Sequence, residues 1–95
     1  MKRTALLALL LPLAGTLVMT YGWRNSPFGI RGKSSTDHGF TWSCEFILSA
    51  DAASWDVGYP STVQLANGTL VTVWYETPKE SHKAVLKQAR WNLTP

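Results

Sequence analysis

A short run of residues occurs twice in this chain and constrains its fold more than any other feature. Residues 15–18 (Gly-Thr-Leu-Val) recur as residues 68–71, and aromatic residues follow each copy within a few positions. A recurrence at about 50 residues is typical of repeat architectures, and the blades of β-propellers have repeats of roughly this length. We therefore expect two copies of one β-sheet unit.

The hydrophobic pattern predicts strands along the whole chain. The expected strands are 6–13, 16–21, 30–34, 45–48, 60–65, 70–76 and 84–93. Residues 84–93 also fit the spacing of a helix, but their position after 70–76 resembles that of 30–34 after 16–21, and this analogy favours a strand. The dipeptide Asn67-Gly68 is a strong hairpin signal.

Residues 1–20 have two interpretations. A basic start followed by a short apolar run is typical of a secretory signal, which would direct the protein to secretion or to the periplasm. Alternatively, residues 6–13 form a buried strand, and this is favoured because a cleaved signal has no reason to share residues 15–18 with a downstream segment. Pro12 and Gly15 interrupt the apolar run, so no stable membrane span is expected.

The composition excludes several classes of protein. With 45% hydrophobic and 12% aromatic residues, the chain is too apolar to be intrinsically disordered. The net charge is +3, but the basic residues are scattered singly, so no nucleic acid is expected as a partner. Cys44 is the single cysteine, which excludes an intrachain disulfide and a cysteine-ligated metal site. We expect neither a metal nor another cofactor.

Residues 35–42 match the pattern S-x-D-x-G-x-T-W at every specified position, namely Ser35, Asp37, Gly39, Thr41 and Trp42. An aspartate at a turn accepts hydrogen bonds from nearby backbone N–H groups, and a glycine supplies a positive φ. Asp37 is therefore expected to cap a structural turn, with Trp42 packed between sheets and His38 facing solvent. An acid/base or metal-binding role for Asp37 and His38 is the less favoured alternative.

This pattern resembles the Asp box of sialidases and related propellers. The flanking sequences strengthen the resemblance: residues 21–24 (Tyr-Gly-Trp-Arg) and 27–31 (Pro-Phe-Gly-Ile-Arg) precede the box, and 58–61 (Gly-Tyr-Pro-Ser) and 65–70 (Leu-Ala-Asn-Gly-Thr-Leu) follow it. In this order they are similar to the C-terminal part of sialidases, from about residue 11 to the end.

The resemblance implies a partial β-propeller. Sialidases are six-bladed, and each blade is a four-stranded antiparallel sheet. Residues 1–54, with the Asp box at 35–42, would form one blade, and residues 55–95 would form the next, incomplete blade.

The resemblance also implies a chemistry. Sialidases cleave terminal sialic acid with retention, using three arginines for the sugar carboxylate, a tyrosine nucleophile with a glutamate partner, and an aspartate as acid/base. Tyr59 is similar in position to the nucleophile, although Pro60 follows it where the family has serine. A packed inner-strand aromatic is the alternative for Tyr59. Arg24 is favoured over Arg31 as a carboxylate ligand because binding residues gather on loops.

The remaining catalytic groups of the family would precede this chain, and Glu76 lies too late to be the glutamate partner. The expected function is therefore that of a fragment of an exo-α-sialidase, inactive alone, whose parent binds a sialylated glycan or another carbohydrate. The alternative is a non-catalytic Asp-box propeller that binds carbohydrate or protein.

Overall fold

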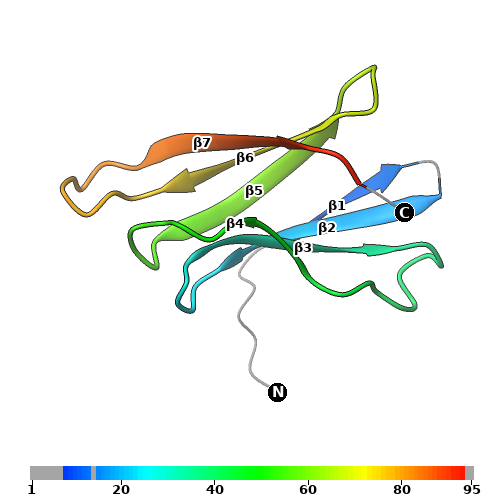
Figure 1. Cartoon of the computed structure of the whole chain (residues 1–95), viewed down its shortest axis with the longest axis horizontal. Helices are drawn as coiled ribbons and strands as arrows, with labels where there is room; N and C mark the ends of the chain where they lie inside the picture. Colours follow the sequence, from blue (N-terminus) through cyan, green and yellow to red (C-terminus); the bar gives the residue numbers. More distant parts are fainter. Residues whose placement is uncertain (1–7, 14, 94–95) are drawn as a thin grey trace.

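The computed structural model of the chain describes residues 8–13 and 15–93, and these residues form an all-β protein (Figure 1). The described strands are β1 (Ala8–Leu13), β2 (Thr16–Trp23), β3 (Gly29–Ser35), β4 (Phe46–Ser49), β5 (Val57–Gln64), β6 (Leu70–Glu76) and β7 (Val85–Trp91). They make two antiparallel sheets, one in the order β1-β2-β3-β4 and the other in the order β5-β6-β7. Neither sheet closes on itself.

The repeated tetrapeptide marks the same place in both sheets. Gly15, with φ of 91°, ends the turn before β2, and Gly68, with φ of 92°, ends the turn before β6. These backbone angles favour glycine because it has no Cβ atom. Each copy therefore starts the second strand of an antiparallel meander, and the sequence repeat is a repeat of structure.

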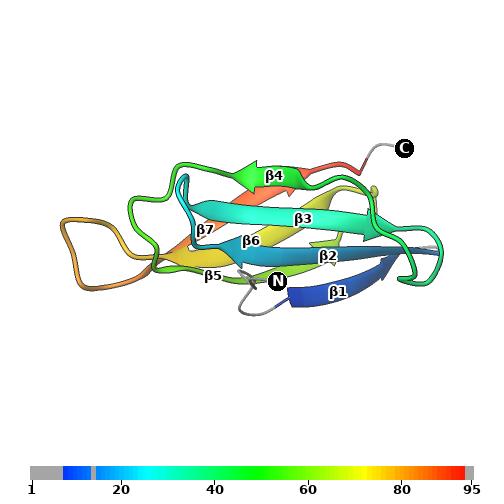
Figure 2. The same ribbon diagram turned by 90° about the horizontal axis from the view of Figure 1, so that it is seen from below.

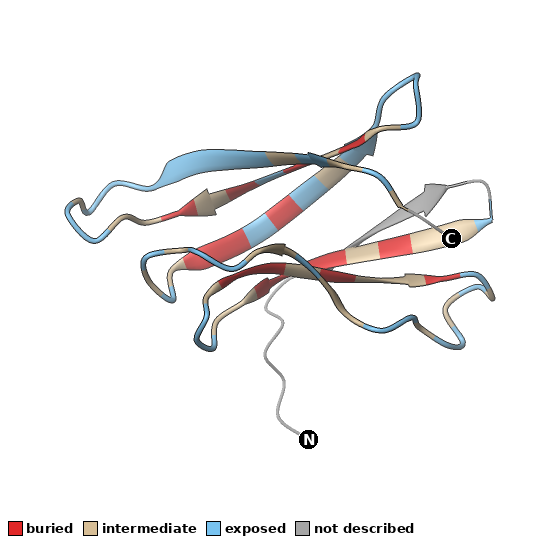
Figure 3. Cartoon of the chain, viewed as in Figure 1, coloured by how far each residue is buried: buried red, intermediate tan, exposed pale blue. Residues whose placement is uncertain are grey.

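The two sheets lie one over the other, as Figure 2 shows from below. The face of β2 that carries Val18 and Thr20 points toward β5, and the hydroxyl of Thr20 lies 3.4 Å from that of Thr62. The core between the sheets is formed by Ile30, Val57 and Trp74. Buried residues follow the strands that meet there, whereas β7 is mostly exposed (Figure 3).

Glycines allow the sheets to approach closely beside this core. A Cβ atom on Gly22 would lie 3.0 Å from the Cα of Gly58 and 3.0 Å from the carbonyl oxygen of Val57. A side chain at position 22 would therefore push β2 away from the start of β5. This contact brings the loop after β2 next to the residues that begin β5.

Most expected strands are present, with shifted ends. The segment 84–93 is a strand, β7, paired along its length with β6, so the helical alternative is wrong. Leu65 N donates to Thr69 O, and Gly68 N donates to Leu65 O, so the Asn-Gly dipeptide makes the expected hairpin. The strand expected at 60–65 begins earlier, at Val57, because the pairing with β6 continues past an irregularity between Gly58 and Ser61.

The N-terminal prediction falls partly outside the described residues. Residues 8–13 form β1, which pairs with β2 from Ala8↔Tyr21 to Leu13↔Thr16. Residues 6 and 7 of the expected strand, and the basic start of the signal-like segment 1–20, are not among the described residues. No helix of the described part is long and apolar enough to span a bilayer.

Candidate functional site

Three loops gather at one end of the two sheets. They follow β2, β4 and β6. The pairs Trp23↔Gly29 and Glu76↔Val85 show that the loops after β2 and β6 each connect paired ends of neighbouring strands. In Figure 1 these loops lie on the left, whereas the turn of residues 35–42 follows β3 at the opposite end. Arg24 belongs to the first loop, and the residues that contact it lie just before β5, at the start of β5 and near the end of β6.

Arg24 is held by neutral acceptors. Its Nε donates to the carbonyl oxygen of Val57 at 3.1 Å, and its Nη2 donates to the hydroxyl of Tyr75 at 2.7 Å. Its guanidinium carbon lies 5.2 Å from the centre of the Trp55 ring. A guanidinium has five N–H donors, so most of its capacity stays available while its orientation is fixed. No acidic side chain among the described residues forms an ion pair with it.

Tyr75 connects Arg24 to an acidic residue. The Tyr75 hydroxyl donates to Oδ1 of Asp56 at 2.6 Å, and the Thr77 hydroxyl donates to the other carboxylate oxygen at 2.8 Å. Burial, together with the hydrogen bond to Asp56, raises the pKa of Tyr75 to about 12. The hydrogen bonds from Tyr75 and Thr77 lower the pKa of Asp56. Tyr75 is therefore a neutral phenol that separates a carboxylate from a guanidinium.

Tyr59 lies beside Tyr75 on an irregular part of β5. The two rings stack with centroids 5.5 Å apart, and Tyr59 is 57% exposed. Its φ is 51°, a left-handed backbone angle that is rare for an aromatic residue. No other described side chain makes a hydrogen bond with its hydroxyl. The bulge thus presents an exposed phenol next to the ring that holds Arg24, at a backbone cost that functional sites often carry.

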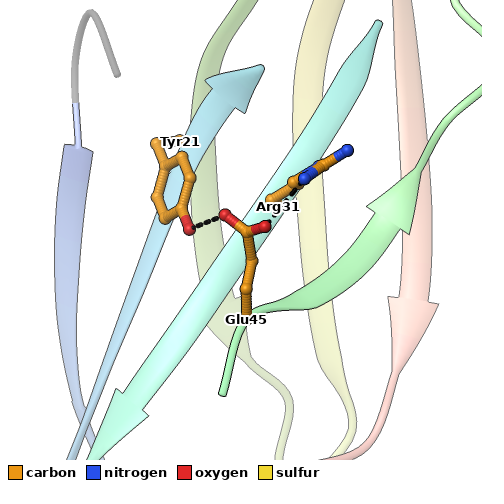
Figure 4. Close-up of polar contacts among 3 residues, drawn as sticks. All are labelled: Tyr21, Arg31 and Glu45. Atoms are coloured by element: carbon orange, nitrogen blue, oxygen red, sulfur yellow. Dashed lines mark hydrogen bonds and ion pairs between the residues drawn. The ribbon is translucent and has the colours of Figure 1, made fainter. Parts of the chain in front are cut away.

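Arg31 lies elsewhere and is already paired. Its Nη1 contacts Oε1 of Glu45 at 2.7 Å, and the Tyr21 hydroxyl donates to Oε2 of the same carboxylate (Figure 4). The Arg31 guanidinium also lies 4.0 Å from the centre of the Trp23 ring. Since side chains alternate along β2, this group occupies the face of the first sheet opposite Gly22. Arg31 and Arg24 are therefore not brought together.

In this second group, which consists of Tyr21, Arg31 and Glu45, the pKa shifts favour a charged Glu45 and a neutral Tyr21. Burial and the hydrogen bond to Glu45 raise the pKa of Tyr21. Burial alone would raise the pKa of Glu45, but the hydrogen bonds from Tyr21 and Arg31 outweigh it, and the pKa is lowered. This arrangement stabilises the outer face of the sheet and leaves little of the charge on Arg31 for a ligand.

The turn of residues 35–42 is organised around Asp37. One carboxylate oxygen accepts hydrogen bonds from the Thr41 backbone N–H and the Ser35 hydroxyl at 2.8 Å each, and the other accepts the Thr41 hydroxyl. The Ser35 hydroxyl also accepts the Gly39 N–H, and Gly39 has φ of 88°. The hydrogen bonds from Thr41 and Ser35 lower the pKa of Asp37 to about 2.

The neighbours of Asp37 in this turn have the surroundings of a surface hairpin. His38 is exposed and has φ of 65°, and Trp42 is half-buried. A Cβ atom on Gly39 would lie 3.6 Å from the Trp42 ring, so the turn and that ring are in contact. The turn lies at the end of the sheets away from Arg24, and both carboxylate oxygens of Asp37 accept hydrogen bonds from Ser35 and Thr41 of the same turn.

Trp55, Asp56 and Tyr75 were missed in the sequence. Trp55 and Asp56 lie two to three residues before residues 58–61, which resemble sialidases, so their position was a usable signal. Tyr75 could be found only through the pairing of Gly58 with Tyr75, which the sequence does not show. Glu76 is buried and accepts the indole N–H of Trp74 at 2.9 Å.

Two hollows of the surface lie away from Arg24. They measure about 450 and 380 Å³ and lie between β4 and β7, and neither Arg24 nor Tyr59 lines them. Among the described residues no group of three or more His, Cys, Asp or Glu side chains could hold a metal ion. The Arg24 group, by which we mean Arg24, Trp55, Asp56, Tyr59 and Tyr75, is thus an open surface. It offers a fixed cation and exposed aromatic rings.

Comparison with known proteins supports the fold alone. A crystal structure described as that of an unknown function protein from Dyadobacter fermentans DSM 18053 matches with a TM-score of 0.76 and 24% sequence identity. The match covers 90% of this chain and 24% of that one, so this chain spans about a quarter of the length of its neighbour. No family model matches the chain, and no curated protein matches it.

Proposed function

We propose that the two sheets are adjacent blades of a sialidase-like β-propeller. The repeat aligns Leu17 in β2 with Leu70 in β6. Val18 and Thr20 of β2 face the second sheet, so Leu17, which alternates with them, points away from that sheet. In β6, by contrast, Leu70 lies on the same face as Trp74, and this face points toward the first sheet. The sheets therefore stack front to back, as blades do around a ring. This order leaves an outer face on each sheet for further blades.

The proposed ligand is a sugar that carries a carboxylate, with terminal sialic acid as the preferred example. The observation that carries this proposal is the Arg24 guanidinium, which is oriented by neutral acceptors and is next to exposed Tyr59 and Trp55. Arginine binds carboxylates through two parallel hydrogen bonds. Aromatic rings beside it offer apolar surface to the faces of a pyranose ring. Arg31 is a weaker candidate because Glu45 already occupies it.

Tyr59 is proposed as the nucleophile of a retaining hydrolysis. Its Oη would attack the anomeric carbon while the glycosidic C–O bond breaks, and the leaving oxygen would take a proton from an acid. The proton of the Tyr59 hydroxyl would pass to a base. A neutral nucleophile suits a substrate whose carboxylate repels Asp and Glu, and sialidases are an exception to the two-carboxylate scheme. Water then cleaves the aryl ketoside with net retention.

The acid and the base are proposed to come from residues outside this chain. No other described side chain makes a hydrogen bond with the Tyr59 hydroxyl, and Asp56 is committed to Tyr75 and Thr77. On this proposal the 95-residue chain binds the sugar and does not hydrolyse it. A longer protein that includes the chain would carry the activity.

Binding is tested with the isotope-labelled chain and the methyl α-glycoside of N-acetylneuraminic acid, followed by NMR. Resonances of the loop after β2 and of residues 55–59 are expected to shift. Arg24→Gln should weaken binding at least about tenfold, because a charged hydrogen bond is lost. The exposed Arg90→Gln serves as the matched control and should bind like the wild type. Unchanged affinity in Arg24→Gln would contradict the proposal.

Catalysis is tested in a longer protein with a fluorogenic sialoside. Tyr59→Phe keeps the ring that stacks on Tyr75 and removes the nucleophilic oxygen, so turnover should be lost while binding stays within about threefold. Full turnover by Tyr59→Phe would exclude the assigned role.

A second candidate function is a non-catalytic propeller that binds a carbohydrate. The absence of a base for Tyr59 among the described residues favours it, because the exposed rings of Tyr59 and Trp55 would serve binding without chemistry. In that case the longer protein binds the sialoside, and neither wild type nor Tyr59→Phe releases the fluorophore.

A further inference from the structure

We infer that Tyr75, anchored by Asp56, is the positioning residue that keeps the Arg24 guanidinium oriented and unpaired for an anionic ligand. The inference rests on the proposed function, because it concerns the same site. It assigns a role to Asp56, which directly precedes β5, and to Tyr75 in β6, two residues that no sequence motif connects.

The Tyr75 hydroxyl both accepts and donates a hydrogen bond. It accepts a hydrogen bond from Nη2 of Arg24 at 2.7 Å and donates its own proton to Asp56 at 2.6 Å. Thr77 holds the far side of the Asp56 carboxylate at 2.8 Å, so the acceptor is itself fixed. The chain Thr77–Asp56–Tyr75–Arg24 therefore sets the direction in which the guanidinium points.

The phenol also prevents a direct ion pair. Asp56 and Arg24 would neutralise each other if they met, as Glu45 and Arg31 do on the other face of the sheet. With the Tyr75 oxygen between them, the carboxylate supplies anchoring and the positive charge stays available. Tyr75 also stacks on Tyr59, so one ring fixes both candidate functional residues.

The inference makes an unusual prediction for Asp56. If only charge mattered, Asp56→Ala would strengthen binding of an anion because a negative charge is removed. If Asp56 anchors Tyr75, the same change weakens binding because Arg24 loses its orientation. We expect Asp56→Ala and Tyr75→Phe each to weaken binding of the methyl α-sialoside about five- to tenfold. Asp51→Ala removes a carboxylate from the same loop, but this carboxylate accepts a hydrogen bond from Ser49 and none from Tyr75 or Arg24, so it should change binding less than about twofold.

A second measurement needs no ligand. NMR of the Arg24 side chain in the full 95-residue chain reports rotation about the Cζ–Nη bonds, which hydrogen bonding slows. Wild type and the control Asp51→Ala should show slow rotation, and Tyr75→Phe and Asp56→Ala should show fast rotation. A protein with a purely structural Tyr75 would show no such change in the variants that stay folded.

The outcomes separate this inference from the proposed function. Equal rotation in wild type and Tyr75→Phe, or tighter sialoside binding by Asp56→Ala, overturns the positioning role. If the wild-type chain does not bind the sialoside but the rotation of the Arg24 side chain depends on Tyr75, the proposed ligand is overturned and the positioning role is supported.

Discussion

Arg24 and Arg31 show how strongly the function of one residue type depends on its immediate surroundings. The sequence makes both of them candidates for a carboxylate ligand, and the structure places Arg24 at the start of the loop after β2 and Arg31 within β3. Arg31 has a carboxylate within 2.7 Å, whereas Arg24 contacts a carbonyl oxygen and a phenol. No sequence pattern distinguishes these two cases, because the partners Glu45 and Tyr75 lie on other strands or loops.

Asp37 provides a pH-dependent test at the scale of one residue. Its pKa is about 2 in the fold against an ordinary 3.8, so folding favours the ionised form. The resulting stabilisation is fully present above the ordinary pKa and is lost as the pH falls through about 2. The wild type should lose thermal stability between pH 4 and pH 2. Asp37→Asn should be less stable than the wild type at pH 6, and its melting temperature should fall less steeply between pH 4 and pH 2 (a flatter acid limb). The loop variant Asp51→Asn is the control, and an Asp37→Asn acid limb as steep as that of the wild type would contradict the expectation.

The backbone of Tyr59 provides another residue-scale test. Alanine normally stabilises a strand relative to glycine, by roughly 0.5–1 kcal/mol. At a φ of 51° the order should reverse, because a Cβ atom costs about 1–2 kcal/mol in the left-handed region. Tyr59→Gly should therefore be more stable to urea than Tyr59→Ala by about 1 kcal/mol, although both lose the stack with Tyr75. If Tyr59→Ala were instead the more stable variant, the backbone at position 59 would not be strained.

At the scale of elements, the strands could be predicted and their irregularities could not. Alternating apolar residues and the Asn67-Gly68 turn are local signals, so β6 was predicted with its observed ends, Leu70–Glu76. Residues 84–93 fit two periods, and only pairing with β6 decides for a strand. The bulge at Tyr59 depends on the register between β5 and β6, which no local pattern records. The candidate site was thus half predictable: Arg24 and Tyr59 were named, whereas Asp56 and Tyr75 were not.

The contact between β3 and β4 gives a test of this packing. A Cβ atom on Gly29 would lie 1.8 Å from the carbonyl oxygen of Ser49, so the two segments must separate in Gly29→Ala. The free energy of unfolding should fall by about 1–3 kcal/mol or more. Gly22→Ala, whose Cβ would lie 3.0 Å from its nearest neighbours, should lose less. A Gly29→Ala variant as stable as the wild type in urea would show that the approach is looser than described.

At the scale of the whole molecule, two open sheets expose more edge and face than a closed β-protein does. β7 is paired only with β6, and Lys87 and Arg90 on it are charges that discourage pairing with another chain. Outer faces of both sheets carry aromatic residues, including Tyr21 on the first and Tyr75 on the second. In the proposed propeller, these faces would contact further blades.

Hydrogen exchange tests this arrangement of strands. Amides of β6, which has a partner on both sides, should exchange most slowly, and the outward amides of β7 should exchange quickly. Protection of those β7 amides equal to that of β6 would mean that another strand covers the edge in solution.

We propose that the Arg24 group recognises the charge of a carboxylated sugar. The most direct measurement compares the affinity of the wild-type chain for the methyl α-glycoside of N-acetylneuraminic acid with that for the methyl ester of the same compound. The ester keeps the shape of the sugar and removes its charge. We predict at least about tenfold tighter binding of the acid, because a charge-assisted bidentate pair is lost in the ester. Equal affinity for the two compounds would contradict this proposal.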